Sequence, residues 1–366
     1  MKIIFIIGSL KSGGAERVAT VISDYLIESG HDVTLVTGTS VESDFYIPSP
    51  EVKRVSLNFN YSAVGLSKFN EELKRFLTLR RIVSEECPDI IIASTTDIAI
   101  RFGLLKSLKM MTVPVIGCEH NTYHAVKSKF KRIVRSMAYR YLDALVVLTD
   151  REKKYYTSIK SKVLRINNPL GIDGGANFRR GDLQSRTIRL LSVGRLTYQK
   201  GYDRLILVAA LLKRRKVNFS WDIVGDGELK ADLQSLIDSK GLSGHVVLRR
   251  STRNIEDYYE NADVFVMTSR WEGLPMVIPE AMSFGLPIIS FDCETGPSEI
   301  LGEGEYGILV NEGNIPDCVS AILSMKSNDN FEKYSNLSVV RASHYRLGTE
   351  IGNIWLSLIK KLVKEQ

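Results

Sequence analysis

The chain has 366 residues, of which 44% are hydrophobic and 25% are charged. This length suits two domains of ordinary size, and the composition excludes a disordered or a fibrous protein. The net charge of +7 favours an anionic partner, and by itself it does not choose between nucleic acid, a lipid surface and phosphorylated ligands.

We expect neither a targeting signal nor disulfide bonds. The first apolar run, residues 3–7, is shorter than the core of a signal peptide, and no run of about 18 apolar residues follows it. We therefore expect a cytoplasmic protein without a transmembrane helix. The cysteines are scattered, without a CxxC pair, and are expected to be reduced core residues: Cys87, Cys118, Cys293 and Cys318.

The first half of the chain alternates short apolar strands with helical segments, a pattern typical of a doubly wound α/β domain. We expect this Rossmann-like domain over residues 1–170. A helix is predicted over residues 15–29, and strands over residues 2–8, 32–37, 90–94, 113–118 and 144–148.

The second half repeats the alternation after a glycine-rich polar linker, residues 171–187. A second Rossmann-like domain is expected over residues 188–345, with strands over residues 188–193, 221–224, 246–248, 264–268 and 287–291. Residues 346–366 predict an amphipathic helix that packs back on the N-terminal domain. Because ligands bind at the carboxyl ends of parallel strands, we expect the two sheets to face a cleft.

A glycine-rich turn, KSGGAER at residues 11–17, follows the first strand and opens the first helix. Such a turn brings an anion close to bare backbone amides and to the positive end of a helix. The spacing of Gly8, Gly13 and Gly14 is not GxGxxG, and no acidic residue closes the second strand, so a dinucleotide cofactor is disfavoured. A tight turn without a ligand is the alternative.

Two loops of the second half carry charge at the ends of predicted strands. Arg195 and Lys200 lie on a loop that can converge on a diphosphate, or can be a solvated basic turn. Glu272 and Glu280 flank a helix predicted to open between residues 275 and 279, where prolines favour a helix start. They suit sugar hydroxyls beside phosphates, although Glu280 can also cap or pair locally.

The segment EGLPMVIPEAMSFGLPII resembles the EX7E signature of glycosyltransferase family 4. Four further segments fall in that family's order: SGGAER, GCEH at residues 117–120, VGRLTYQKG at residues 193–201 and IVGDGEL at residues 223–229. The resemblance covers most of the chain. It implies the GT-B architecture and a retaining transfer of a sugar from a nucleotide diphosphate sugar, with no cofactor because that sugar donor is a substrate.

The resemblance also implies roles for individual residues of the second half. Arg195 and Lys200 would bind the donor diphosphate, Glu272 would hold hydroxyls of the transferred sugar, and Glu280 would bind the ribose. Backbone amides near Gly273 and Leu274 would contact the sugar or the phosphates.

Two residues of the first half complete the expected site. Gly14 would line the cleft beside the phosphates, and His120 would contact the sugar. The residues expected to act in catalysis are thus His120, Arg195, Lys200 and Glu272. One departure from the family pattern, Arg250 ahead of Asn254, leaves the base open, with UDP favoured over GDP.

No metal is expected. The sequence has no Asp-x-Asp between apolar strands and no cluster at metal-ligand spacing, so protein cations would meet the phosphate charge. The expected reaction is front-face attack, in which the departing phosphate takes the proton of the acceptor; this expectation comes from the resemblance. A nucleotide-sugar epimerase of the same fold is the alternative, and it would rearrange a sugar without an acceptor.

Residues 127–141 predict a basic amphipathic helix. Its apolar face comprises Phe130, Ile133, Val134, Met137, Ala138 and Tyr141, and its cations are Lys127, Lys129, Lys131, Arg132, Arg135 and Arg140. It could lie on the inner face of the plasma membrane or be a packed surface helix with solvated cations. Similar enzymes build bacterial surface polysaccharides on a polyprenyl diphosphate carrier, so we expect a glycan or lipid-linked glycan acceptor and no nucleic acid. Thr96 and Asp97 are candidates for the acceptor wall.

Overall fold

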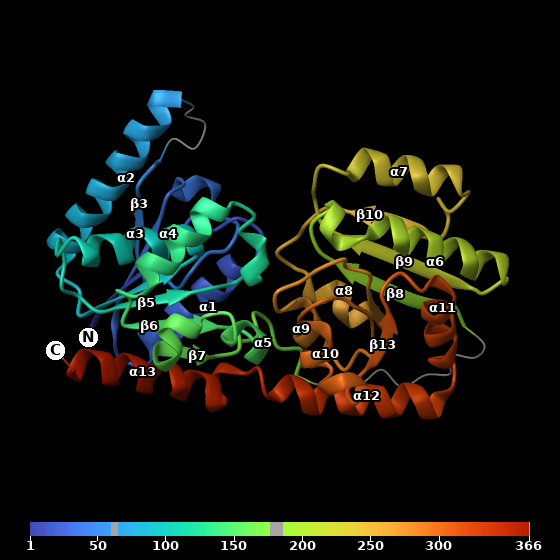
Figure 1. The fold of residues 1–366 in the computed structure, drawn as a ribbon. Coiled ribbons are helices and arrows are strands. Elements are labelled where there is room, and N and C mark those ends of the chain that lie inside the picture. The colour runs from blue at the N-terminus through green and yellow to red at the C-terminus, as the bar shows by residue number, and fades with distance from the viewer. Residues whose placement is uncertain (60–64, 176–185, 366) are drawn as a thin grey trace. The chain divides into compact units, whose positions relative to one another are not determined.

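The structure, a computed structural model, describes residues 1–59, 65–175 and 186–365. Unit 1 comprises Met1–Pro169 and Leu347–Gln366, and unit 2 comprises Leu170–Arg346 (Figure 1). Of the predicted linker 171–187, residues 176–185 lie outside the described part of the chain. Each unit is built around its own parallel sheet, so the predicted fold class is confirmed.

The sheet of unit 1 has seven parallel strands in the order β3-β2-β1-β4-β5-β6-β7. They are β1 (Lys2–Ile7), β2 (Asp32–Thr37), β3 (Lys53–Ser56), β4 (Ile90–Ser94), β5 (Val115–Cys118), β6 (Ala144–Val147) and β7 (Val163–Arg165). The central strands are buried apolar runs, as expected for a parallel sheet covered on both faces. The sequence did not predict β3 and β7, because these two edge strands are short and only partly apolar.

Helices cover both faces of this sheet. They are α1 (Gly14–Glu28), α2 (Gly65–Glu86), α3 (Thr96–Ser107), α4 (Lys129–Tyr139), α5 (Asp150–Lys153) and α13 (Gly352–Lys364), with short turns η1 (Val41–Ser43), η2 (Tyr123–Ala125), η3 (Thr157–Lys162) and η6 (Leu347–Ile351). Val18 of α1 and Trp355 of α13 share one core with Ile3 and Phe5. Leu79 of α2, Phe102 of α3 and Ala138 of α4 belong to a second core.

The sheet of unit 2 has six parallel strands in the order β10-β9-β8-β11-β12-β13. They are β8 (Ile188–Val193), β9 (Phe219–Val224), β10 (Val246–Arg249), β11 (Val264–Met267), β12 (Ile288–Asp292) and β13 (Ile308–Asn311). The helices are α6 (Tyr202–Arg214), α7 (Lys230–Ser239), α8 (Glu256–Asn261), α9 (Val277–Ser283), α10 (Pro297–Ile300), α11 (Ile315–Ser324) and α12 (Asn328–Ser343), with η4 (Tyr198–Lys200) and η5 (Gly302–Gly304). The edge strand β13 was not predicted.

Both sheets have the same topological switch point. In unit 1 the chain order reverses at β1, which lies between β2 and β4; in unit 2 it reverses at β8, which lies between β9 and β11. Loops that leave two such neighbouring strands run to opposite faces and leave room for a ligand between them. The loops after β1 and β4, and those after β8 and β11, are therefore the places to look for a site.

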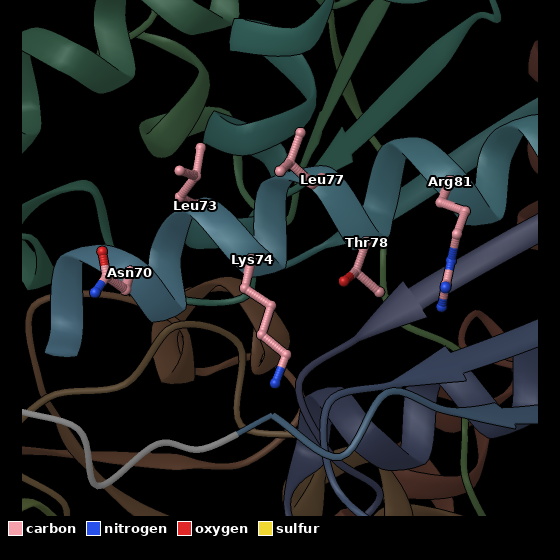
Figure 2. A pocket seen from close by; sticks show the side chains of 6 residues that line it. All are labelled: Asn70, Leu73, Lys74, Leu77, Thr78 and Arg81. Carbon is pink, nitrogen blue, oxygen red and sulfur yellow. The ribbon is translucent and has the colours of Figure 1, made fainter.

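Three further features concern the surface. Cys118, Cys293 and Cys318 are buried, as predicted, whereas Cys87 is exposed just after α2, so its predicted place in the core was wrong. Figure 2 shows a hollow of about 380 Å³ along α2, lined by Asn70, Leu73, Lys74, Leu77, Thr78 and Arg81. None of the predicted site residues lines it. In the part of the chain that the structure describes, every helix is too short or too polar to cross a bilayer.

Candidate functional site

The loop after β8 is held against the end of β11 by close backbone packing. Gly201 has a φ of 66°, and a Cβ atom there would lie 2.2 Å from the carbonyl oxygen of Thr268. The hydroxyl of Thr268 donates to the carbonyl oxygen of Gly201 at 3.0 Å. Only glycine fits this contact, which brings the loop carrying Arg195 and Lys200 close to the loop carrying Glu272.

Lys200 and Glu272 form an ion pair between these two loops. The Nζ atom of Lys200 lies 2.6 Å from Oε1 of Glu272, and their side chains are only 15% and 7% exposed. The Ser269 hydroxyl donates to the same carboxylate oxygen at 2.6 Å, and the Gln199 amide reaches Oε2 at 3.4 Å. The structure thus brings together the cation and the carboxylate that the sequence assigned to neighbouring parts of one ligand.

Arg195 lies on the same loop and is exposed. A glycine-rich loop after β9 supports it: a Cβ atom at Gly225 would lie 2.0 Å from the carbonyl oxygen of Gly194, and one at Gly227 would lie 2.4 Å from that of Leu196. The amide of Leu196 also donates to the carbonyl oxygen of Asp226 at 2.9 Å. The IVGDGEL segment therefore shapes the backbone that presents Arg195.

The helix α9 begins at Val277, inside the predicted window, and Glu280 lies in its first turn. Glu280 is buried, and its Oε2 atom accepts a hydrogen bond from the Tyr259 hydroxyl at 3.3 Å. Before the helix, Gly273 and Leu274 lie under the loop that follows β12. A Cβ atom at Gly296 would approach the carbonyl oxygen of Gly273 to 2.6 Å, so this crossing also requires glycine.

In unit 1, Gly14 is the first residue of α1. A Cβ atom at Gly14 would meet nothing within 4 Å, whereas one at Gly13 would lie 2.1 Å from a carboxylate oxygen of Glu16. The backbone at Gly14 is therefore open for a close approach, while Gly13 makes room for an internal contact. The Glu16 carboxylate lies at the same helix N-terminus, where it accepts a hydrogen bond from the Ser9 hydroxyl at 3.3 Å.

His120 follows β5 and contacts the end of β4. Its Nε2 atom lies 2.7 Å from the Ser94 hydroxyl, and burial lowers the pKa of the imidazole to about 4. Among the described residues, its buried Nδ1 atom has no hydrogen-bond partner. At neutral pH the imidazole ring is therefore uncharged.

A buried polar cluster beside His120 was missed at the sequence level. The carboxylate of Glu119 accepts hydrogen bonds from Thr96, at 2.6 Å, and from the hydroxyl of Tyr139. Burial raises the pKa of this carboxyl group. Arg135 is only 2% exposed and lies over the ring of Tyr123 at 4.1 Å, so its predicted place on a solvated face was wrong.

The two candidates for the acceptor wall are thus engaged within unit 1. Thr96 donates to Glu119, and Asp97 forms an ion pair with Lys131 of α4 at 2.5 Å. The signal that could have found the cluster is the spacing of Arg135 and Tyr139, four residues apart on one helical face, behind a glutamate that follows a buried strand. In the described residues, no three His, Cys, Asp or Glu side chains come together as a metal-binding cluster.

Comparisons with known proteins show the family of the chain. Residues 12–173 match the family described as Glycosyltransferase Family 4, and residues 176–338 match the family described as Glycosyl transferases group 1. The chain is 33% identical over 309 residues to the amylovoran biosynthesis glycosyltransferase AmsD of Erwinia amylovora, covering 83% of this chain and 84% of AmsD.

A second relative matches over nearly the full length of both chains. It is a Campylobacter jejuni α-1,4-N-acetyl-D-galactosaminyltransferase named for a PP-undecaprenol-linked substrate, 29% identical and covering 99% of each chain. Among solved structures, Anabaena HepE with UDP and glucose superposes with a TM-score of 0.79 at 18% identity, covering 98% of this chain and 99% of HepE. The chain belongs to glycosyltransferase family 4, and its two parallel-sheet domains have the GT-B fold.

Proposed function

We propose that this glycosyltransferase moves a hexose, with retention of configuration, from a UDP-sugar to a growing polyprenyl-diphosphate-linked glycan of a bacterial surface polysaccharide. The main support for the donor site is the Lys200–Glu272 ion pair, 2.6 Å apart at the switch point of unit 2. Arg195 is exposed on the loop that carries Lys200. Together they offer cations for a diphosphate next to a carboxylate for sugar hydroxyls.

The reaction that these residues support is metal-independent. The bond between the anomeric carbon and the β-phosphate oxygen breaks, and a bond from that carbon to the acceptor oxygen forms on the same face. The acceptor proton passes to the departing phosphate oxygen. Arg195 and Lys200 stabilise the charge that develops on this phosphate, while Glu272 orients the sugar.

The relatives support the choice of donor and acceptor. HepE is described in complex with UDP and glucose, AmsD is named for amylovoran biosynthesis, and the Campylobacter enzyme is named for a substrate on PP-undecaprenol. A substrate carried on a polyprenyl chain stays in the bilayer. We therefore propose that the enzyme works from the cytoplasm at the inner face of the plasma membrane, on an anionic lipid surface.

Thermal unfolding in EDTA with a panel of nucleoside diphosphates tests the donor site. UDP at 100 times its Kd should stabilise the enzyme by about 2.7 kcal/mol, which is about 5–10 °C for a domain of this size. Lys200→Ala should lose most of this shift, whereas Lys213→Ala, an exposed lysine on α6, should keep it. A shift with GDP alone, or one that requires Mg²⁺, would contradict the proposed donor site.

Transfer from a radiolabelled UDP-sugar to a polyprenyl-diphosphate-linked glycan tests the reaction. Glu272→Gln should retain UDP binding within about threefold, because it leaves both cations in place, while transfer falls by about 100-fold or more. Sugar rearrangement in the absence of any acceptor would instead identify an epimerase.

A further inference from the structure

Helix α4 exposes large apolar side chains on one face and does not bury them in a core. Three large side chains on this face are exposed: Phe130 by 76%, Ile133 by 60% and Met137 by 58%. Their spacing places them on one stripe along the helix, and Tyr141, two residues past its end, is 49% exposed. We call this stripe, together with the cations beside it, the α4 face.

The opposite side of α4 is firmly packed in unit 1. Ala138 and Tyr139 are buried, and the Tyr139 hydroxyl donates to Glu119. Arg135 is buried over the ring of Tyr123, and its guanidinium donates to the carbonyl oxygen of that residue at 3.4 Å. Helices α3 and α4 lie side by side in Figure 1. The outward exposure of the stripe is therefore fixed by the contacts of the buried side.

Charge beside the stripe has one sign. Residues 127–141 contain six Lys or Arg residues and no Asp or Glu. Two of these cations are already engaged: Lys131 pairs with Asp97, and Arg132 donates to the carbonyl oxygen of Val126 at 2.7 Å. Three others are exposed, and they border the apolar stripe: Lys127, Lys129 and Arg140.

Helix α2 gives a contrast within the same unit. It also exposes apolar side chains, Leu73 by 50% and Leu77 by 48%, on the hollow of Figure 2. Its charges are mixed, however, and Glu72 pairs with both Arg75 and Arg101. Exposed apolar side chains beside charges that are all positive are thus a property of α4 and not of α2.

We infer that the α4 face docks on a bilayer that contains anionic lipid. The exposed side chains of the stripe would enter the headgroup and acyl boundary, and Lys127, Lys129 and Arg140 would lie at the level of the lipid phosphates. This inference deepens the proposed function, because a polyprenyl-linked acceptor lies in the bilayer, but the surface is argued from its own exposure and charge.

Co-sedimentation of the full-length protein with vesicles tests the docking. Binding to vesicles of equal phosphatidylglycerol and phosphatidylcholine should be at least about tenfold tighter than binding to pure phosphatidylcholine. Phe130→Ser/Met137→Ser should weaken binding to the anionic vesicles by about tenfold or more. Ile47→Ser/Leu108→Ser removes two comparably exposed apolar side chains from the same unit and should leave binding unchanged.

The cations have a matched test. Lys129→Glu/Arg140→Glu should weaken binding by at least about 25-fold, since each cation near an anionic surface contributes about a fivefold change in affinity. Lys360→Glu/Lys361→Glu makes the same change in net charge on α13 and should have a much smaller effect. In a Met137→Trp variant, the fluorescence emission of the introduced tryptophan should shift to shorter wavelength when anionic vesicles are added.

Several results would overturn the inference. They are equal binding to both vesicle types, control variants that lose as much binding as the α4 variants, and a dimer in light scattering that the Phe130→Ser/Met137→Ser change dissociates. The last result would assign the face to a second copy of the chain. All variants should keep the stabilisation by UDP, so a failure to dock is distinguishable from a failure of the donor site.

Discussion

The ion pair between Lys200 and Glu272 makes a quantitative prediction for stability. Replacing Lys200 by Met leaves a 7% exposed carboxylate with only the Ser269 hydroxyl at 2.6 Å and the Gln199 amide at 3.4 Å. Removing one partner of a buried pair costs about 3–5 kcal/mol, and the 15% exposure of Lys200 reduces this to about 2–3 kcal/mol. For a domain of this size, Tm should fall by about 5–10 °C.

The double variant Lys200→Met/Glu272→Gln separates this effect from a loss of packing. It removes both charges, and the amide of Gln can still accept the hydrogen bond from Ser269. The free energy of unfolding should therefore lie within about 1 kcal/mol of the parent protein, so the double variant should be at least about 1 kcal/mol more stable than Lys200→Met.

Urea unfolding of the parent and the two variants, followed by tryptophan fluorescence at neutral pH without nucleotide, measures this difference. Trp221 lies in the core of unit 2 and reports on the unit that carries the pair. Equal destabilisation in the single and the double variant would refute the reasoning, because it would mean that the lysine contributes packing and not charge. No loss in the single variant would show that solvent screens the carboxylate.

Three further predictions concern other parts of the chain. Gly201→Ala should lower the free energy of unfolding in urea by about 2–4 kcal/mol, because its Cβ would clash with the carbonyl oxygen of Thr268. Gly313→Ala, at φ 77° with open space, should lower it by only about 1 kcal/mol. Equal losses would contradict the steric argument. The pKa of His120 is lowered to about 4, so the unfolded chain takes up the proton first as pH falls below 6.5, and stability should drop by up to about 3 kcal/mol between pH 6.5 and 4. An imidazole NMR titration midpoint near 6.5 for His120 would refute this, and His120→Asn should remove this part of the pH dependence, leaving the part due to other groups such as His31. Of the four cysteines, only Cys87 should react quickly with a thiol reagent in the native protein, and Cys87→Ser should abolish that reaction; fast labelling of a second thiol would contradict the burial of the other three.

Local sequence signals predicted the central strands and the start of α9. The prolines around EGLP placed the start of α9 within three residues, and the buried apolar runs located the central strands of both sheets. Three of the four edge strands were missed. Lys53–Ser56 and Val163–Arg165 are short and carry cations, so they lack an apolar run. Ile308–Asn311 has only three apolar residues, and two of them are partly exposed. Their pairing depends on the sheet beside them more than on their own sequence.

Long-range pairs were the part that the sequence could not supply. Lys200 and Glu272 were each predicted as ligand contacts, but their mutual pairing requires that β8 and β11 be neighbours, which follows from the strand order. Arg135 was misplaced because a cation on a helix is usually solvated; here the ring of Tyr123 and the nearby carboxylate of Glu119 make its burial tolerable.

The split of unit 1 along the chain has a consequence for synthesis. Trp355 and Leu358 of α13 belong to the same core as β1, yet they leave the ribosome only after all of unit 2 has been made. At about 5–20 residues per second, this delay lasts about 10–35 s. During that time unit 2 can fold as a continuous stretch of chain, while part of one apolar face of the unit 1 sheet stays exposed because α13 has not yet been made. The nascent N-terminal half is therefore the species that we expect to need chaperone protection.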